Sequence, residues 1–443
     1  MRAQILRLAV PSFLALVAEP LFLLMDSAIV GHLGVAQLAG LGVASSVLST
    51  AASLFVFLAY GTTSVVARAI GAGRPRAAAS AGMDGLWLSL LLGTASAAAA
   101  WAFVEPVSRA LGASGEVLTH ATAYLRVAAF GIPGMLVTMA VTGVLRGFQD
   151  TRTPLVVSVA GFSANALLNV WFVYGLGLSV PGSAWGTVAA QTGMGLVLVA
   201  ALLRIARREG ASGAFHPAGV LRAALDGVPL IVRTAALRAV LLLTVFVAAG
   251  LGPVALAAHQ VAFTLWTFLT FTLDALAIAA QALTGKALGA GDVAGARAAT
   301  DVMVRWGTVS GAILGAFVVV LSPVLPILFT PDAATRAATT SALVVVGAGQ
   351  VLSGYVFVLD GVLIGAGDGR WLAGAMVVLL LAYLPLVLAV RVLGPTLLAW
   401  GTPWATVGLW VAFTGFMAVR ALMLGRRARG DGWLVPGLAG PDA

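Results

Sequence analysis

The chain has 443 residues, of which 60% are hydrophobic and only 9% are charged, and its mean hydropathy is +1.04. Soluble globular domains carry about 25% charged residues, so this composition indicates a polytopic membrane protein. The sequence contains no cysteine, which excludes a disulfide framework and a thiolate metal site. The net charge of +9 does not indicate nucleic-acid binding, because the basic residues are scattered between apolar segments and form no single aromatic-laced patch.

Apolar windows of about 20 residues predict transmembrane helices, because only a hydrogen-bonded helix or a closed barrel satisfies its backbone in lipid. Twelve such windows follow one another along the chain, at 10–31, 43–67, 83–104, 119–145, 154–178, 183–204, 228–250, 255–284, 302–322, 338–364, 372–393 and 398–419. The apolar run at the N-terminus is followed by no small-residue cleavage site, so we expect it to begin a retained first helix. The sequence therefore predicts an all-α membrane protein with twelve spans.

The basic residues predict the orientation of these spans. With a cytoplasmic N-terminus, the cytoplasmic loops and span ends carry 19 Lys and Arg residues, Arg68 and Arg420 among them. The opposite side carries three, which are Arg109, Arg336 and Arg391. Following the positive-inside rule, we expect a multi-pass protein of the plasma (cytoplasmic) membrane with both termini in the cytoplasm. Arginine outnumbers lysine 24 to 1, which suggests a GC-rich bacterial genome.

An internal repeat appears when the sequence is shifted by 218 positions against itself. Val10-Pro11 then aligns with Val228-Pro229, ARAIGAG (67–73) aligns with GKALGAG (285–291), and Gly143 aligns with Gly361. Two copies of a six-helix unit enter the membrane in the same orientation, so an axis along the membrane normal should relate them. This arrangement predicts two pseudo-symmetric six-helix bundles that face each other across a central cleft. The expected ranges are 1–206 for the N-lobe, 207–224 for a cytoplasmic linker, 225–425 for the C-lobe and 426–443 for a cytoplasmic tail.

Four acidic residues lie within predicted spans, and each is present in only one copy of the repeat. Glu19, Asp26, Asp274 and Asp360 align with Leu237, Thr244, Val56 and Thr142. A charged group at the centre of a bilayer costs about 2.5–3.5 kcal/mol on insertion scales, so an acid in this position is a candidate functional residue. Glu19 and Asp26 are seven residues apart and therefore share one face of the first helix.

Asp26 is the leading candidate for proton coupling, with Glu19 beside it. A desolvated carboxyl group can bind and release a proton near neutral pH, although a carboxyl that stays protonated and only bonds a neighbouring helix is the alternative. Asn165 and Asn169, on one face of the fifth span, form an N-lobe polar cluster. Their amides would bond a protonated Asp26, contribute to an ion site, or only join helices.

The C-lobe candidates are Asp274, Gln281, Asp360 and Arg238. Asp360 could serve in gating or ion coupling, or it could cap a helix end. Asp274 shares a helix face with Gln281, which follows it by seven residues. Arg238 aligns with Pro20, so an ion pair with Glu19 across the cleft is one hypothesis. The alternative is that Arg233 and Arg238 extend to the cytoplasmic interface.

Nucleotide and metal chemistry find no support in the sequence. There is no GxxxxGK[ST] loop and no HExxH motif, so we expect no cofactor and no metal site. Energy would come from an ion gradient, worth about 2.3 kcal/mol per charge per 100 mV.

Four segments in order along the chain carry a family resemblance: VPSFLALVAEPLFLLMDSAIVGHLG, LAAHQVAF, LDALAIAAQALTGKALGAGD and LDGVLIGAGD. Together they resemble the multidrug and toxic compound extrusion (MATE) family, most closely its DNA-damage-inducible protein F-like branch. The resemblance implies two lobes that form a V and cation-coupled antiport of organic compounds that are often cationic or amphipathic. It also implies proton coupling at Asp26 and, as in other branches, cation coupling at Asp360. Where the family often has an aspartate this chain has Asn169, which favours protons over Na⁺.

The main hypothesis is a proton-coupled multidrug efflux antiporter and not an enzyme. The expected partners are drug-like small molecules, protons and the lipid bilayer, without nucleic acid, and the expected state is a monomer. The alternatives are a sodium-coupled drug antiporter, a lipid-linked precursor flippase of the same superfamily, or, from another class, a membrane-embedded enzyme or receptor.

Overall fold

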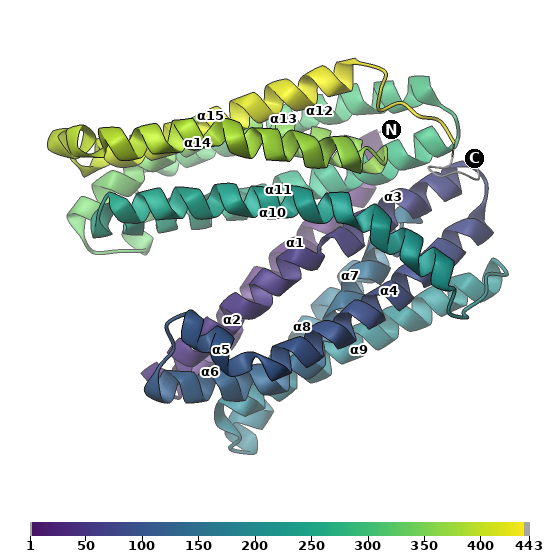
Figure 1. The fold of residues 1–443 in the computed structure, drawn as a ribbon, viewed down its shortest axis with the longest axis horizontal. Coiled ribbons are helices and arrows are strands. Elements are labelled where there is room, and N and C mark those ends of the chain that lie inside the picture. The colour runs from purple at the N-terminus through teal and green to yellow at the C-terminus, as the bar shows by residue number, and fades with distance from the viewer. Residues whose placement is uncertain (1, 438–443) are drawn as a thin grey trace. The chain divides into compact units, whose positions relative to one another are not determined.

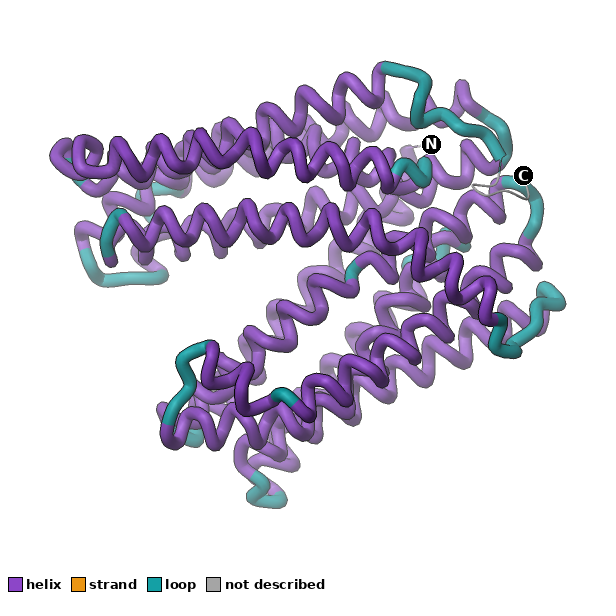
Figure 2. The backbone as a smooth tube through the Cα atoms, viewed as in Figure 1, coloured by secondary structure: helices purple, strands orange, loops and turns teal. Residues whose placement is uncertain are grey.

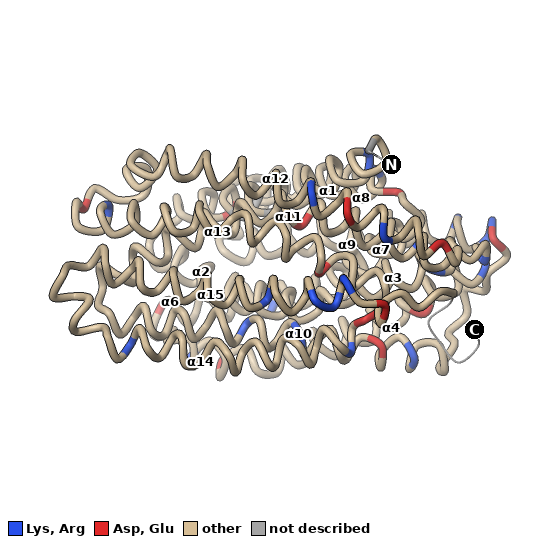
Figure 3. Tube along the Cα trace, turned by 90° about the horizontal axis from the view of Figure 1, so that it is seen from above, with Lys and Arg blue, Asp and Glu red and all other residues tan. Residues whose placement is uncertain are grey.

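A computed structural model describes residues 2–437, and within these residues all regular structure is helical (Figure 2). The side chains of Arg2, Glu19, Phe22 and Leu23 lie outside the described part. The predicted all-α membrane fold is confirmed. Eleven segments of the described chain are long and apolar enough to cross a membrane, and the first helix adds a shorter apolar stretch, Ala3–Ala18. Most of the length of the helices carries no charged residue (Figure 3).

The first half of the chain, from residue 2 onward, forms nine α-helices (Figure 1). They are α1 (Arg2–Gly31), α2 (Val35–Phe55), α3 (Phe57–Gly71), α4 (Pro75–Ala102), α5 (Val104–Ala110), α6 (Gly115–Ala128), α7 (Ile132–Gly147), α8 (Arg152–Val170) and α9 (Ser179–Arg208). A 3₁₀ turn, η1 (Ala129–Gly131), joins α6 to α7, and a π turn, η2 (Trp171–Gly175), ends α8. Pro133 explains η1, since it lacks the N–H that would donate to the carbonyl of Ala129.

The second half of the described chain contains six α-helices of 28 residues or more and a 3₁₀ turn. They are α10 (Pro217–Gly250), α11 (Pro253–Gly289), α12 (Val293–Leu321), η3 (Leu325–Leu328), α13 (Ala333–Gly365), α14 (Gly369–Trp400) and α15 (Thr402–Arg429). These helices extend beyond the predicted windows, because hydropathy marks only the apolar part of a helix whose backbone hydrogen bonds continue. Of the predicted linker 207–224, only 209–216 lies outside α9 and α10.

The chain folds into two compact units, which we describe separately. The N-unit contains residues 10–228 and Gly437, and the C-unit contains residues 229–436 and the start of α1. The division falls inside α10, at the Val228-Pro229 pair. An apolar cluster that includes Val30, Leu41 and Tyr124 joins α1, α2, α6 and α9 in the N-unit.

Close glycine contacts occur at equivalent places in the two units. A methyl group at Gly143 of α7 would overlap the carbonyl oxygen of Ala59 in α3. A methyl group at Gly361 of α13 would overlap the carbonyl oxygen of Ala277 in α11. Both pairs are related by the shift of 218 that the sequence repeat shows. The duplicated unit therefore keeps the same helix-to-helix approach in both copies, and small residues permit it.

Candidate functional site

Asp26 lies on α1 inside the N-unit and is buried, with 4% of its surface exposed. Two neutral side chains donate hydrogen bonds to the same carboxylate oxygen, Oδ1. Asn169 Nδ2 of α8 is 2.7 Å away, and Ser183 Oγ of α9 is 2.6 Å away. The carboxyl group therefore joins three helices through donors that carry no charge.

A second layer of polar groups surrounds these three residues. Asn165, one turn before Asn169 on α8, donates to Thr187 Oγ1 of α9 over 3.5 Å. The phenol oxygen of Tyr124, on α6, is 3.5 Å from the same Thr187 oxygen. Within the described residues, the amide oxygens of Asn165 and Asn169 are buried without a hydrogen-bond partner. The structure thus brings the predicted N-lobe residues Asp26, Asn165 and Asn169 into one cluster.

Space for the Asn169 side chain comes from Gly186 of α9. A methyl group at Gly186 would overlap Asn169 Oδ1, so α9 can approach α8 this closely only with glycine at that position. The amide plane of Asn169 is therefore held between Asp26 on one side and the α9 backbone on the other.

The C-unit contains a different buried cluster. Asp360 of α13 accepts hydrogen bonds at Oδ2 from Arg233 of α10 and from Arg420 of α15. All three side chains are buried, with 6%, 7% and 3% of their surfaces exposed for Asp360, Arg233 and Arg420. The triad places two arginines on one carboxylate oxygen in a low-dielectric interior, so removing any one of the three charges would leave the others buried without compensation.

Two predictions for these residues need correction, and Arg420 is more buried than a position at a span end suggests, because α15 continues past the predicted span to Arg429. Arg233 does not extend to an interface, because Asp360 holds it inside the unit. Asp360 caps no helix end, since it lies within α13 and pairs with side chains of other helices.

The remaining candidates are less closely associated. Asp274 of α11 is half-buried and interacts electrostatically with Arg420. Gln281 is buried on the same helix, and Arg238 is exposed. The proposed partner of Arg238, the Glu19 side chain, lies outside the described residues, so that ion pair remains a prediction. Among the described residues, no group of three His, Cys, Asp or Glu side chains gathers as a metal site.

Sequence reasoning missed Ser183, Tyr124 and Arg420. Ser183 is the first residue of the sixth predicted window. The one sequence feature that could have identified it is its position directly before the repeated AWGT segment (184–187). Arg420 follows the last predicted window by one residue, and a longer window would have included it.

Comparison with known proteins gives a consistent result. The MatE family model matches residues 11–171 and 229–390, two ranges that begin 218 residues apart. Protein DETOXIFICATION 44, chloroplastic, of Arabidopsis thaliana is 30% identical, over 94% of this chain and 80% of that protein. DNA damage-inducible protein F of Escherichia coli (strain K12) is 28% identical, over 94% and 90% of the two chains. Among solved structures, the outward-facing conformation of a multidrug resistance MATE family transporter of the MOP superfamily has a TM-score of 0.85 at 24% identity, covering 96% of this chain and 95% of that one.

Proposed function

The chain belongs to the MatE family of multidrug efflux transporters, and from this premise we propose that it exports organic compounds in exchange for protons. The substrates are often cationic or amphipathic, and the two six-helix lobes alternate access between the two sides of a plasma membrane. The observation that carries the proposal is the position of Asp26, a buried carboxyl group whose hydrogen-bond donors in the described part of the chain are neutral.

Neutral partners suit a group that changes its protonation state. Hydrogen bonds from Asn169 and Ser183 satisfy the ionised form at Oδ1. Both hydrogen bonds end on Oδ1, so a proton that binds at Oδ2 leaves them intact. An amide offers both a donor and an acceptor, so Asn165 and Asn169 can serve either form of the acid.

The test is pH-driven ethidium transport in proteoliposomes in sodium-free buffer. We expect wild type to move ethidium under an imposed pH gradient and Asp26→Asn to bind ethidium without moving it. Asp301→Asn, a change at an exposed acid of α12, is the matched control and should transport like wild type. Equal transport by wild type and Asp26→Asn would contradict the proposal and direct attention to Glu19 or Asp274.

Sodium coupling is the second candidate, and one observation favours it. Within the described part of the chain, the amide oxygens of Asn165 and Asn169 are buried without a donor in the cluster that contains Asp26, and oxygen atoms of this kind suit a hard cation. Replacing the pH gradient with a sodium gradient at equal pH separates the candidates: transport under sodium alone would overturn proton coupling. Asp360 offers no comparable cation site, because two arginines already donate to it.

A further inference from the structure

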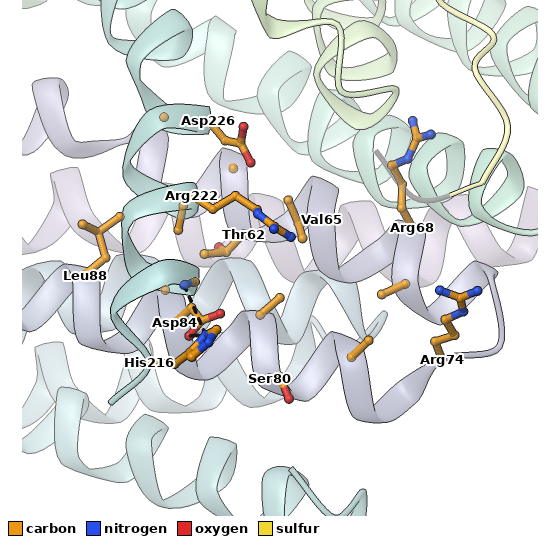
Figure 4. A pocket seen from close by; sticks show the side chains of 18 of the residues that line it. Thr62, Val65, Arg68, Arg74, Ser80, Asp84, Leu88, His216, Arg222 and Asp226 are labelled. Carbon is orange, nitrogen blue, oxygen red and sulfur yellow. Dashed lines mark hydrogen bonds and ion pairs between the residues drawn. The ribbon is translucent and has the colours of Figure 1, made fainter. Parts of the chain in front are cut away.

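A cavity of about 920 Å³ lies in the N-unit where α3, α4 and the start of α10 meet (Figure 4). Its volume is within the range of small-molecule sites. Part of the wall is apolar and comes from Phe57, Leu58, Val65 and Leu88. The ionisable groups that line it are Arg68, Arg74, Arg76, Asp84, Glu209, His216, Arg222 and Asp226.

Specific contacts hold the start of α10 against α4. Trp87 Nε1 donates to the carbonyl oxygen of Gly213 over 3.2 Å, and the Phe215 ring packs edge-on against Trp87 with centroids 5.6 Å apart. His216 Nδ1 is 3.9 Å from Asp84 Oδ1, and a methyl group at Gly219 would overlap the same carboxylate. These contacts make the cavity a built feature and not a gap between loosely placed helices.

Four arginines and three carboxylates line the cavity, so its lining carries a small excess of positive charge. Figure 4 shows Arg222 extending from α10 into the cavity toward Val65, with Arg74 at its edge. Asp84 interacts with His216 and Arg222, and Glu209 lies 3.6 Å from Arg208. Among the described residues, neither Arg74 nor Arg76 takes part in an ion pair, and both are exposed. Asp84 and Glu209 thus have basic groups beside them, and Asp226 is the third carboxylate of the lining, while Arg74 and Arg76 are available to a ligand.

The turn at the start of α4 carries Arg74 and Arg76, but the equivalent turn in the other half of the repeat does not share this positive charge. At the position equivalent to Arg74, Asp292 caps α12 by accepting a hydrogen bond from the backbone N–H of Gly295 over 2.7 Å. At the start of α4, no side chain of the described residues accepts a hydrogen bond from the backbone N–H groups of the first turn. The first turn of α4 therefore leaves N–H groups available next to two arginines, and both features favour an anion.

We propose that this cavity binds an acidic phospholipid of the cytoplasmic leaflet. Its phosphate lies between Arg222 and the turn that carries Arg74 and Arg76, and its glycerol and first acyl carbons lie against Phe57 and Val65. Basic pockets between helices on the cytoplasmic side suit acidic headgroups, and the basic residues of the sequence assign this end of the unit to that side. Free phosphate shares the arginine chemistry but leaves the apolar wall unused. The bound lipid fastens α10 to α3 and α4, whichever ion is coupled.

The test measures lipid binding to the full-length protein in detergent. Fluorescent phosphatidylglycerol and phosphatidylcholine are titrated against wild type, Arg74→Gln/Arg222→Gln and the control Arg204→Gln/Arg207→Gln. The control removes the same charge from exposed positions of α9 outside the cavity. We expect the cavity variant to lose affinity for phosphatidylglycerol about tenfold, and the control to stay near wild type. If the cavity variant and the control lost affinity for phosphatidylglycerol equally, the binding would reflect general attraction to surface charge, and the proposal would be overturned.

A second pair of variants tests the cavity without changing charge. Gly61 of α3 lines the cavity, and a larger side chain there would meet open space. Gly42 of α2 also faces open space but does not line the cavity. Gly61→Leu should lower phosphatidylglycerol binding, and Gly42→Leu should not. Equal binding of phosphatidylcholine and phosphatidylglycerol by wild type would overturn the choice of an acidic lipid. Displacement of phosphatidylglycerol by millimolar inorganic phosphate would identify free phosphate as the occupant and would also overturn the proposal.

Discussion

The two units place different chemistry at positions that the repeat makes equivalent. Asp26 of the N-unit corresponds to Thr244 of the C-unit, and Asn165 corresponds to Tyr383. Thr244 and Tyr383 are hydrogen-bonded to each other, with their hydroxyl oxygens 2.7 Å apart. Equivalent helices thus contact each other through an ionisable group in the N-unit and through a pair of neutral hydroxyl groups in the C-unit.

The acid of the C-unit differs in its partners. Asp360 corresponds to Thr142 of the N-unit, and two arginines donate to it. Neutral donors can support an acid in both protonation states, whereas a permanent cation supports only the ionised state. The glycine contacts at Gly143 and Gly361 show that the scaffold stayed the same while these buried polar groups diverged. The Asp26 carboxyl thus accepts hydrogen bonds from neutral side chains, whereas the Asp360 carboxyl is held by two permanent charges.

The largest expected effect is on stability, from Asp360→Asn. This change leaves Arg233 and Arg420 buried without their counter-charge, which costs about 3–5 kcal/mol of the free energy of unfolding. Asp26→Asn keeps the shape of a side chain that has only neutral partners, so its cost should be much smaller. Thermal unfolding of both variants in detergent measures the difference. Equal losses would remove the distinction between the two clusters.

The second effect tests the shared scaffold. Gly143→Ala and Gly361→Ala each force a methyl group against a backbone carbonyl, at a cost of about 1–3 kcal/mol. We expect the two losses to be similar, because the contacts are equivalent. Gly42→Ala, which meets open space in α2, should instead stabilise by up to about 1 kcal/mol. A large loss at only one of the paired glycines would contradict equivalent packing.

Much of the fold could be predicted because its signals lie along the sequence. Apolar windows, the positions of basic residues and the shift of 218 need no tertiary information, and the spacing of Asn165 and Asn169 already placed both on one helix face. The partners of Asp360 could not be predicted in the same way. Hydropathy counts each arginine as a cost and therefore ended the last window before Arg420. Pairing with Asp360, which offsets that cost, exists only in three dimensions.

A third effect separates stability from transport. Ser183→Ala removes one donor from Asp26, and Thr244→Val leaves the Tyr383 hydroxyl without its partner, so each should cost about 1 kcal/mol. Only Ser183→Ala should lower pH-driven ethidium efflux in proteoliposomes, because only that hydroxyl contacts the proposed proton carrier. If Thr244→Val lowered efflux equally, the proton-coupling role would not be confined to the N-unit cluster.

The smallest effect compares the start of α13 with that of α6. Asp332 caps α13 by accepting a hydrogen bond from the Thr335 backbone N–H over 2.7 Å, whereas the equivalent Ser114 makes no side-chain cap at α6. Asp332→Ala should therefore lower the unfolding temperature slightly, and Ser114→Ala should leave it unchanged.

The effect at Asp332 also depends on pH. Hydrogen bonds from the side chain and the backbone of Thr335 lower the pKa of this carboxyl below its ordinary value. A depressed folded-state pKa contributes stability that is fully present above the unfolded pKa of about 3.9 and is lost as the pH falls through the folded-state value. The difference in unfolding temperature between wild type and Asp332→Ala should accordingly be constant near neutral pH and shrink only below about pH 4. A difference that persisted in strong acid would show that packing, and not the charged cap, holds the start of α13.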